Sequence, residues 1–142
     1  MRKNILKRTI RFGLLVSILS TLANLLYFYL SKVLGEQYLI PFTDPPTVTQ
    51  PMSVLMVILV TFLSAILATF LYASLAKVAP NATLSPFLSI TGTAFLVSLG
   101  GPIELPGTVL QTKLLLIGMH IIAALIIIGG FIYFHKQSKI NI

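Results

Sequence analysis

The chain of 142 residues has no cysteine, no tryptophan and only three acidic residues. Without cysteine there is no disulfide framework, no thiolate metal ligand and no thiol nucleophile. Charged residues make up 9% of the chain, whereas an average soluble domain has about 25%. Hydrophobic residues make up 56%, which is more than a small water-soluble domain can bury. Length and composition exclude a multidomain enzyme, a disordered tail and a disulfide-rich secreted protein, and they indicate a membrane protein.

Four segments are long enough and apolar enough to cross a bilayer, which takes about 20 residues in a helix. They run over about residues 12–31, 53–76, 84–101 and 114–134, and none has a charged residue in its interior. We therefore expect an all-α integral membrane protein with one domain, a bundle of four transmembrane helices. A cleaved signal peptide is the alternative for the first segment, because Thr21-Leu22-Ala23 resembles a cleavage site. The apolar run continues to Leu30, which favours an uncleaved helix.

The basic residues predict the orientation of this bundle. Eight of the ten Lys and Arg residues fall on the side that holds both termini, and only Lys32 and Lys113 fall on the other side. All three acids, Glu36, Asp44 and Glu104, lie on that second side. Because an excess of Lys and Arg marks cytoplasmic segments, both termini are predicted to be cytoplasmic. The net charge of +7 is then explained by anionic lipid headgroups near the basic N-terminus, and no nucleic-acid partner is expected.

Small and polar residues recur at spacings of three or four within three of the predicted spans. The rows are Gly13, Ser17, Ser20, Asn24, Tyr27 and Ser31 in the first, Thr61, Ala65, Thr69 and Ala73 in the second, and Ser85, Ser89 and Thr93 in the third. Such spacings place side chains on one face of a helix. Helices in lipid associate through small residues, so we interpret all three rows as packing faces.

Asn24 and His120 are the polar side chains that stand out within the spans. Asn24 lies seven residues before Ser31, and His120 lies seven residues after Lys113. Both are therefore roughly 10 Å below the same membrane boundary. One hypothesis is an outward-facing polar pocket with His120 as ligand or proton acceptor, and with Glu104 and Lys113 above it. The alternative is an ordinary hydrogen bond between helices.

Few residues are available for catalysis or for a cofactor. The three acids fall in loops, so no pair of carboxylates is expected within the spans. His120 and His135 are the only histidines, and fifteen residues along one helix separate them by roughly 22 Å. No metal or other cofactor is predicted, and an enzyme is the third choice of function.

Two loops contain most of the helix-breaking residues. The segment from about Lys32 to Met52 carries four prolines, and it either folds over the ends of the helices or is a plain connector. The shorter segment Gly100–Gly107 contains Pro102 and Pro106. It is either a tight turn or a re-entrant piece, and the latter requires cover by protein or water.

The chain resembles a family of small four-helix bacterial membrane proteins of uncharacterised function. The resemblance rests on the basic start, the Asn in the first span, the proline-rich loop, a third span ending in Gly100-Gly101-Pro102, and Gly118-Met119-His120. It implies a multi-pass protein of the bacterial cytoplasmic membrane and supplies no site residues. We expect an accessory or binding component of the membrane, as a homo-oligomer or with a membrane-protein partner. The alternative is a small oligomeric transporter or channel with a polar site near Asn24 and His120.

Overall fold

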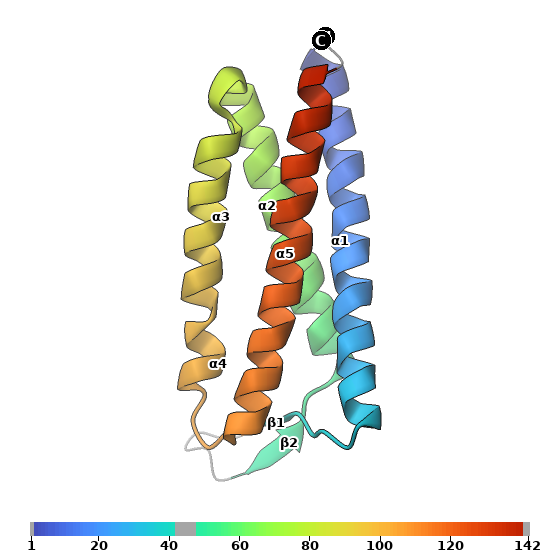
Figure 1. Cartoon of the computed structure of the whole chain (residues 1–142), viewed down its shortest axis with the longest axis vertical. Helices are drawn as coiled ribbons and strands as arrows, with labels where there is room; N and C mark the ends of the chain where they lie inside the picture. The colour runs from blue at the N-terminus through green and yellow to red at the C-terminus, as the bar shows by residue number, and fades with distance from the viewer. Residues whose placement is uncertain (1, 42–47, 141–142) are drawn as a thin grey trace.

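The structure, a computed structural model, describes residues 2–41 and 48–140. Long helices run up and down beside one another, with both ends of the chain at one end of the bundle (Figure 1). We call this the termini end, and the opposite end, where the two strands lie, the hairpin end. The elements in chain order are α1 (Arg2–Val33), β1 (Leu39–Pro41), β2 (Thr49–Pro51), α2 (Val54–Val78), the 3₁₀ turn η1 (Pro80–Ala82), α3 (Leu84–Ser98), α4 (Gly100–Glu104) and α5 (Leu110–Ile140).

The fold class predicted from the sequence is confirmed. Four helical stretches are long and apolar enough to cross a membrane: Leu6–Val33, Val54–Val78, Leu84–Glu104 and Leu110–Ser138. The helices extend past the predicted segments, since α1 begins before Phe12 and α5 continues beyond Phe134. Hydropathy marks only the part of a helix that suits hydrocarbon. Flanking Lys and Arg side chains can continue the same helix into the headgroup region.

The ends of α1 and α2 follow from local chemistry. After α1, Gly35 adopts a φ of 90°, a left-handed conformation that glycine tolerates best. The Glu36 N–H then donates to the Ser31 carbonyl and the Gly35 N–H to the Lys32 carbonyl, which is the Schellman arrangement of a helix C-terminus. At the start of α2 the Ser53 side chain accepts a hydrogen bond from the Met56 N–H at 3.2 Å. Ser53 is thus an N-cap.

The third span continues further than the sequence predicted. It was expected to end at about Gly101, whereas α4 carries the helical path on to Glu104. The break at Leu99 has a simple cause: Pro102 has no N–H to donate to the carbonyl four residues earlier, at Ser98. A turn follows α4, and in it Gly107 has a φ of 66°.

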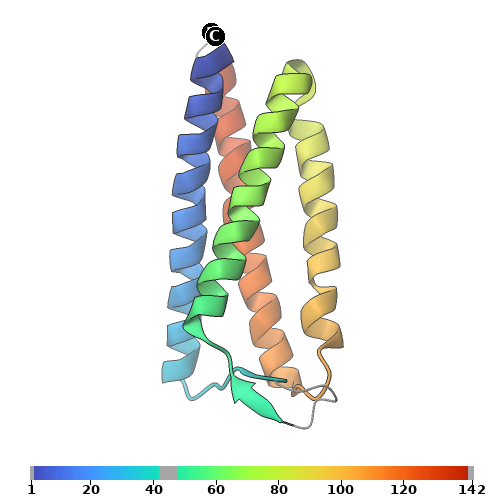
Figure 2. The ribbon, with the colours of Figure 1, turned by 180° about the vertical axis from the view of Figure 1, so that it is seen from behind.

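The described parts of the proline-rich segment form two short strands at the hairpin end of the bundle. Strands β1 and β2 pair antiparallel, with Leu39 opposite Pro51 and Pro41 opposite Thr49. The two strands lie across the ends of the helices (Figures 1 and 2). The sequence predicted no strand here, because each is only three residues long and contains a proline. Asp44, one of the three acids, lies outside the described residues.

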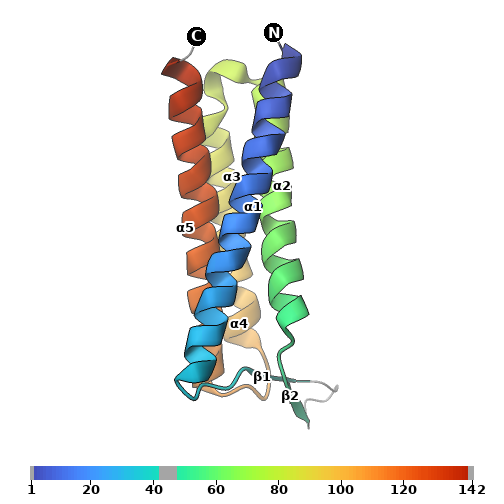
Figure 3. The same ribbon diagram turned by 90° about the vertical axis from the view of Figure 1, so that its right-hand side faces the viewer.

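The helices are unequally packed. α1 packs against α2 and α5, while α3 lies on the far side of the bundle against α5 and α2 (Figure 3). Of the most apolar stretch of each helix, 39% is buried in α1 and 6% in α3 and α4 together. The bundle therefore has one well-covered helix and one that is largely exposed to its surroundings.

Burial confirms two of the three predicted packing faces. Ser17 and Ser20 in the first row are fully buried, as are Ala65 and Thr69 in the second. The third was wrong: Ser85, Ser89 and Thr93 are exposed on α3. Small size alone does not select the packed side of a helix. On α3 the buried position is Phe87, whose ring fills the wider space between α2 and α5.

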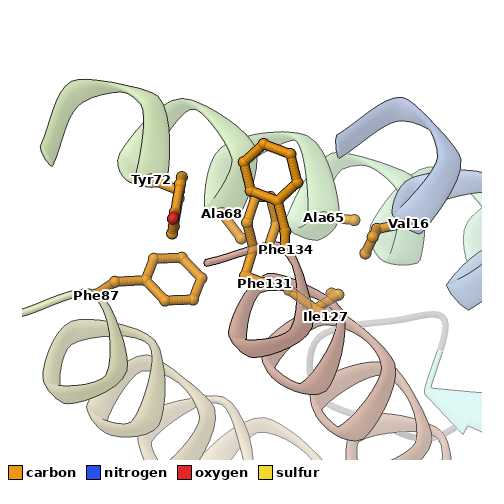
Figure 4. Close-up of a cluster of buried hydrophobic side chains, with 8 residues drawn as sticks. All are labelled: Val16, Ala65, Ala68, Tyr72, Phe87, Ile127, Phe131 and Phe134. Atoms are coloured by element: carbon orange, nitrogen blue, oxygen red, sulfur yellow. The ribbon is translucent and has the colours of Figure 1, made fainter. Parts of the chain in front are cut away.

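An aromatic cluster joins the four long helices near the termini end (Figure 4). Phe131 of α5 lies at its centre, with ring centroids 4.9 Å from Tyr72 on α2 and 5.1 Å from Phe87 on α3. Phe12 on α1 stacks on Phe134 at 4.7 Å. Each pair lies within the range in which aromatic rings attract one another. Through Phe87 this cluster fixes the exposed α3 to α2 and α5.

Candidate functional site

Asn24 is buried between α1 and α2, with 3% of its surface exposed. Its Nδ2 donates to Thr61 Oγ1 on α2 at 2.9 Å. Its Oδ1 is buried and accepts no hydrogen bond from the described residues. A buried polar group without a partner costs free energy, and here the surroundings are helix surfaces in a bilayer. Asn24 thus links α1 to α2 through Nδ2, while its buried Oδ1 has no hydrogen-bond partner among the described residues.

Replacing Thr61 by valine tests this link. Thr61→Val removes the acceptor of Nδ2 and leaves the whole amide without a partner, so the free energy of unfolding should fall by about 1 kcal/mol. Asn24→Leu combined with Thr61→Val removes both polar groups and should recover most of this loss. Reversible unfolding in mixed detergent micelles measures each value.

The control is Ser64→Ala, which removes a hydroxyl from an exposed position of the same helix α2 and should change the stability little. A double variant no more stable than Thr61→Val alone would contradict the assigned link.

His120 lies half-buried on α5, and its Nδ1 is 2.8 Å from the carbonyl oxygen of Leu116 in its own helix. A carbonyl oxygen only accepts, so Nδ1 is the donor of this hydrogen bond. Two residues earlier, Gly118 faces α1: a Cβ there would lie 2.5 Å from the Tyr27 hydroxyl. Residues two apart point to opposite sides of a helix. His120 therefore points away from the side of α5 that Tyr27 touches.

Lys113 and the end of α4 come together at the hairpin end. The Lys113 Nζ donates to the Ile103 carbonyl at 2.8 Å, next to Glu104, which is the last residue of α4. A cation at the C-terminus of a helix satisfies carbonyls that have no partner within the helix. Among the residues that the structure describes, Lys113 forms no ion pair with Glu104. Its observed role is to bind the end of α4 to α5.

The four predicted residues thus fall into separate groups. Lys113 adjoins Glu104 at the hairpin end, Asn24 links α1 to α2, and His120 bonds within α5. Among the described residues, the hydrogen bonds found for Asn24 and His120 are to Thr61 and to Leu116, not to each other. The shared polar pocket stays a prediction.

A polar network that the sequence did not predict closes the hairpin end, and we call it the cap network. The Tyr38 hydroxyl lies 2.6 Å from Ser31 Oγ, Thr112 Oγ1 donates to the Gln37 carbonyl at 3.1 Å, and Gln111 Nε2 donates to Glu36. Ser31 itself donates to the Tyr27 carbonyl, so the Tyr38 hydroxyl is the donor to Ser31. Burial raises the pKa of the Tyr38 phenol, which keeps this donor protonated.

The sequence carried a partial signal for this network. Ser31 was recognised as part of a polar row on α1, but its partner Tyr38 sits in a loop without periodicity. A second polar contact, between the Tyr72 hydroxyl on α2 and His135 Nδ1 on α5 at 2.8 Å, was not predicted either. Contacts between residues 63 apart in sequence depend on tertiary packing, which local patterns do not specify.

The profile of one protein family matches residues 5–136, which is nearly the whole chain. The chain belongs to this family, DUF6069, a family of unknown function. The expectation of an uncharacterised family is confirmed by this match. No curated protein and no solved structure matches the chain.

The family supplies no reaction, so the chemistry of a DUF6069 chain must be read from its residues. Within residues 2–41 and 48–140, no three His, Asp or Glu side chains lie close enough together to hold a metal ion. The arrangement can pack helices and bind the hairpin to α5, and it leaves Nε2 of His120 outside the hydrogen bond to Leu116. The member described here is a small membrane protein of unknown activity.

Proposed function

We propose that the protein is a multi-pass component of the bacterial cytoplasmic membrane, with both termini in the cytoplasm. The supporting observation is the separation of charge along the bundle. Arg8 and Arg11 on α1, Lys77 on α2 and Lys136 on α5 belong to the termini end, whereas Glu36 and Glu104 belong to the hairpin end. An excess of Lys and Arg selects the cytoplasmic side of a membrane.

Reporter fusions test this orientation. A reporter that is active only in the cytoplasm should be active at either terminus, and one that is active only in the periplasm should be inactive at both. The periplasmic reporter inserted after Gly35, at the hairpin end, should give the opposite result. Periplasmic activity at either terminus would overturn the orientation.

The role proposed for this component is non-catalytic: it assembles through the outward face of α3, and its partner is a second copy of the same chain. The observation that carries the proposal is the exposed row of Ser85, Ser89 and Thr93 on the least buried helix. Rows of small residues four apart allow close approach of two helices in lipid. Hydroxyl groups both donate and accept hydrogen bonds, so the row is complementary to itself, as the interface of a symmetric dimer requires.

Gly92 supports the same face. A Cβ at Gly13 or at Gly118 would collide with a neighbouring helix, and one at Gly130 would touch Val16, so packing within the chain explains these glycines. A Cβ at Gly92 would meet nothing within 4 Å. Glycine costs about 1 kcal/mol in a helix interior relative to alanine. The space beside Gly92 would admit a helix from a second copy, although Gly129 on α5 is equally open, so the hydroxyl row carries the choice of α3.

Single-cysteine cross-linking tests the dimer. Because the chain has no cysteine of its own, any disulfide between two copies must join the introduced residues. In membranes, Ser89→Cys should give a disulfide-linked dimer on mild oxidation. The matched control is Ser74→Cys, an exposed serine at a similar level on α2, which should stay monomeric. Equal cross-linking of both variants would indicate random collision. No dimer from Ser89→Cys, together with a monomeric mass in detergent, would overturn the proposal.

A small transporter or channel is the second candidate, and the observation that favours it is the unpartnered Oδ1 of Asn24. Reconstitution of the pure protein in vesicles separates the two functions. A solute flux that Asn24→Leu abolishes would favour transport over the accessory role.

A further inference from the structure

A groove lies between α1 and α5 at the termini end. It has a volume of about 390 Å³ and is lined by Arg8, Arg11, Phe12, Leu15, Tyr133, Phe134 and Gln137. The rings of Phe12 and Phe134, with centroids 4.7 Å apart, form part of its wall. The groove is open along the helix surfaces and is not an enclosed cavity.

The groove changes in polarity along the bundle axis. Arg8 and Arg11 lie nearer to the termini end on α1, and Leu15 lies one turn deeper. On α5 Gln137 is likewise outermost, and Tyr133 is one turn deeper. Leu15 is 51% exposed and Tyr133 is 60% exposed, so the deeper part opens sideways toward the acyl chains of the bilayer. The groove is thus almost wholly apolar and has two exposed arginines at its rim, the same order in which a phospholipid presents its chains and its headgroup.

The charge at the rim of the groove has no counterpart among residues 2–41 and 48–140. Neither arginine forms an ion pair with a carboxylate of the described residues, and Glu36 and Glu104 lie at the opposite end. Two guanidinium groups one turn apart can each form paired hydrogen bonds with phosphate oxygens. Basic pockets between transmembrane helices on the cytoplasmic side are a known mode of binding anionic headgroups.

We infer that this groove is a binding site for one anionic phospholipid, with its phosphate between Arg8 and Arg11 and an acyl chain along Phe12, Leu15 and Tyr133. The occupant is a lipid of the surrounding leaflet, because the apolar wall contributes only if the ligand carries a chain. This site is on the α1 and α5 side of the bundle, whereas the proposed dimer uses α3. The two proposals can therefore fail separately.

The absence of tryptophan allows a direct test, since one introduced tryptophan is the only such fluorophore. Leu15→Trp places the indole in the groove, and Leu67→Trp places it on an exposed part of α2 as the matched control. Each protein is reconstituted in phosphatidylcholine vesicles that contain brominated phosphatidylglycerol or brominated phosphatidylcholine at equal mole fraction. Bromine quenches an indole that it touches, so the ratio of the two quenching curves gives the selectivity at each position.

We expect Leu15→Trp to favour phosphatidylglycerol at least about fivefold, and Leu67→Trp to show no preference. In the Leu15→Trp protein, the additional substitutions Arg8→Gln and Arg11→Gln should lower the preference for phosphatidylglycerol to about onefold. The control adds Lys7→Gln and Lys77→Gln to the Leu15→Trp protein instead. These substitutions remove the same amount of charge from exposed residues at the termini end and should leave the preference for phosphatidylglycerol unchanged.

Equal selectivity at both tryptophan positions, or equal loss in the two charge variants, would mean general surface attraction and would overturn the site. Relief of quenching by inorganic phosphate, but not by chloride at the same ionic strength, would mean a free-phosphate site and would overturn the lipid assignment.

Discussion

Gly13→Ala should be the most damaging single-methyl substitution in the chain. A Cβ on this residue of α1 would lie 2.7 Å from the Cβ of Thr69 on α2 and would overlap the outer atoms of the same side chain. The contact is with a short, branched side chain on a packed helix, so relief requires α1 and α2 to move apart. We expect the free energy of unfolding to fall by about 3 kcal/mol, the upper part of the usual range for overpacking.

A compensating series identifies the cause. In the Gly13→Ala background, Thr69→Ala should recover part of the loss, because it removes the outer atoms but keeps the Cβ, and Thr69→Gly should relieve the collision fully. The matched control is Gly129→Ala, since a Cβ there would meet nothing within 4 Å. That variant should gain up to about 1 kcal/mol from the higher helix propensity of alanine. If Thr69→Gly gives no recovery in the Gly13→Ala background, the close approach of α1 to α2 is not the cause.

Phe131→Ala should be the most damaging truncation. Phe131 is 0% exposed and contacts the rings of Tyr72, Phe87 and Phe12. In a bilayer, moving an apolar side chain from lipid into the protein core changes the free energy little. The loss of stability in Phe131→Ala therefore arises from the cavity and from broken ring contacts. We expect a loss of about 3 kcal/mol in unfolding free energy, the lower end of the range for truncating a buried Phe in water-soluble proteins.

Unfolding in detergent measures the loss of stability in Phe131→Ala, and proteolysis shows which part of the chain becomes accessible. Because Phe131 joins α3 to the other helices, the η1 turn between α2 and α3 should become more sensitive to protease in Phe131→Ala. Phe70→Ala makes the same truncation at a position that is 59% exposed on α2, and it should leave both measurements near the wild-type values. Equal losses in the two variants would mean that the aromatic cluster does not fix α3.

The membrane-spanning helices were predictable because apolar length is a local property of the sequence. The rows on α1 and α2 were predictable for a similar reason, since Ser17, Ser20 and Ala65 repeat at helical spacing. The error on α3 shows the limit of that reasoning. A row of small residues indicates that another helix can approach closely, but it does not indicate whether that helix belongs to the same chain. That distinction depends on Phe87, whose size places the other face of α3 toward the bundle.

The candidate site was less predictable than the fold. Depth could be counted along each helix, so Asn24 and His120 were correctly recognised as polar residues within the predicted spans. Rotation about the helix axis could not be counted from one sequence, because it depends on which neighbour each helix meets. The contact of Gly118 with Tyr27 sets that rotation for α5, and it leaves His120 on another side. The groove of Arg8 and Arg11 was not predicted either, since its two walls are more than 100 residues apart.

The cap network has a consequence for biosynthesis. The chain emerges from the ribosome with its N-terminal part first, so α1 and α2 can pair as soon as both have entered the membrane. Glu36 and Gln37, in contrast, bind Gln111 and Thr112, which are 75 residues later. The hairpin that follows α1 therefore lacks these hydrogen bonds until α5 has been synthesised and inserted. The first loop of the chain is among the last parts of the protein to find its place.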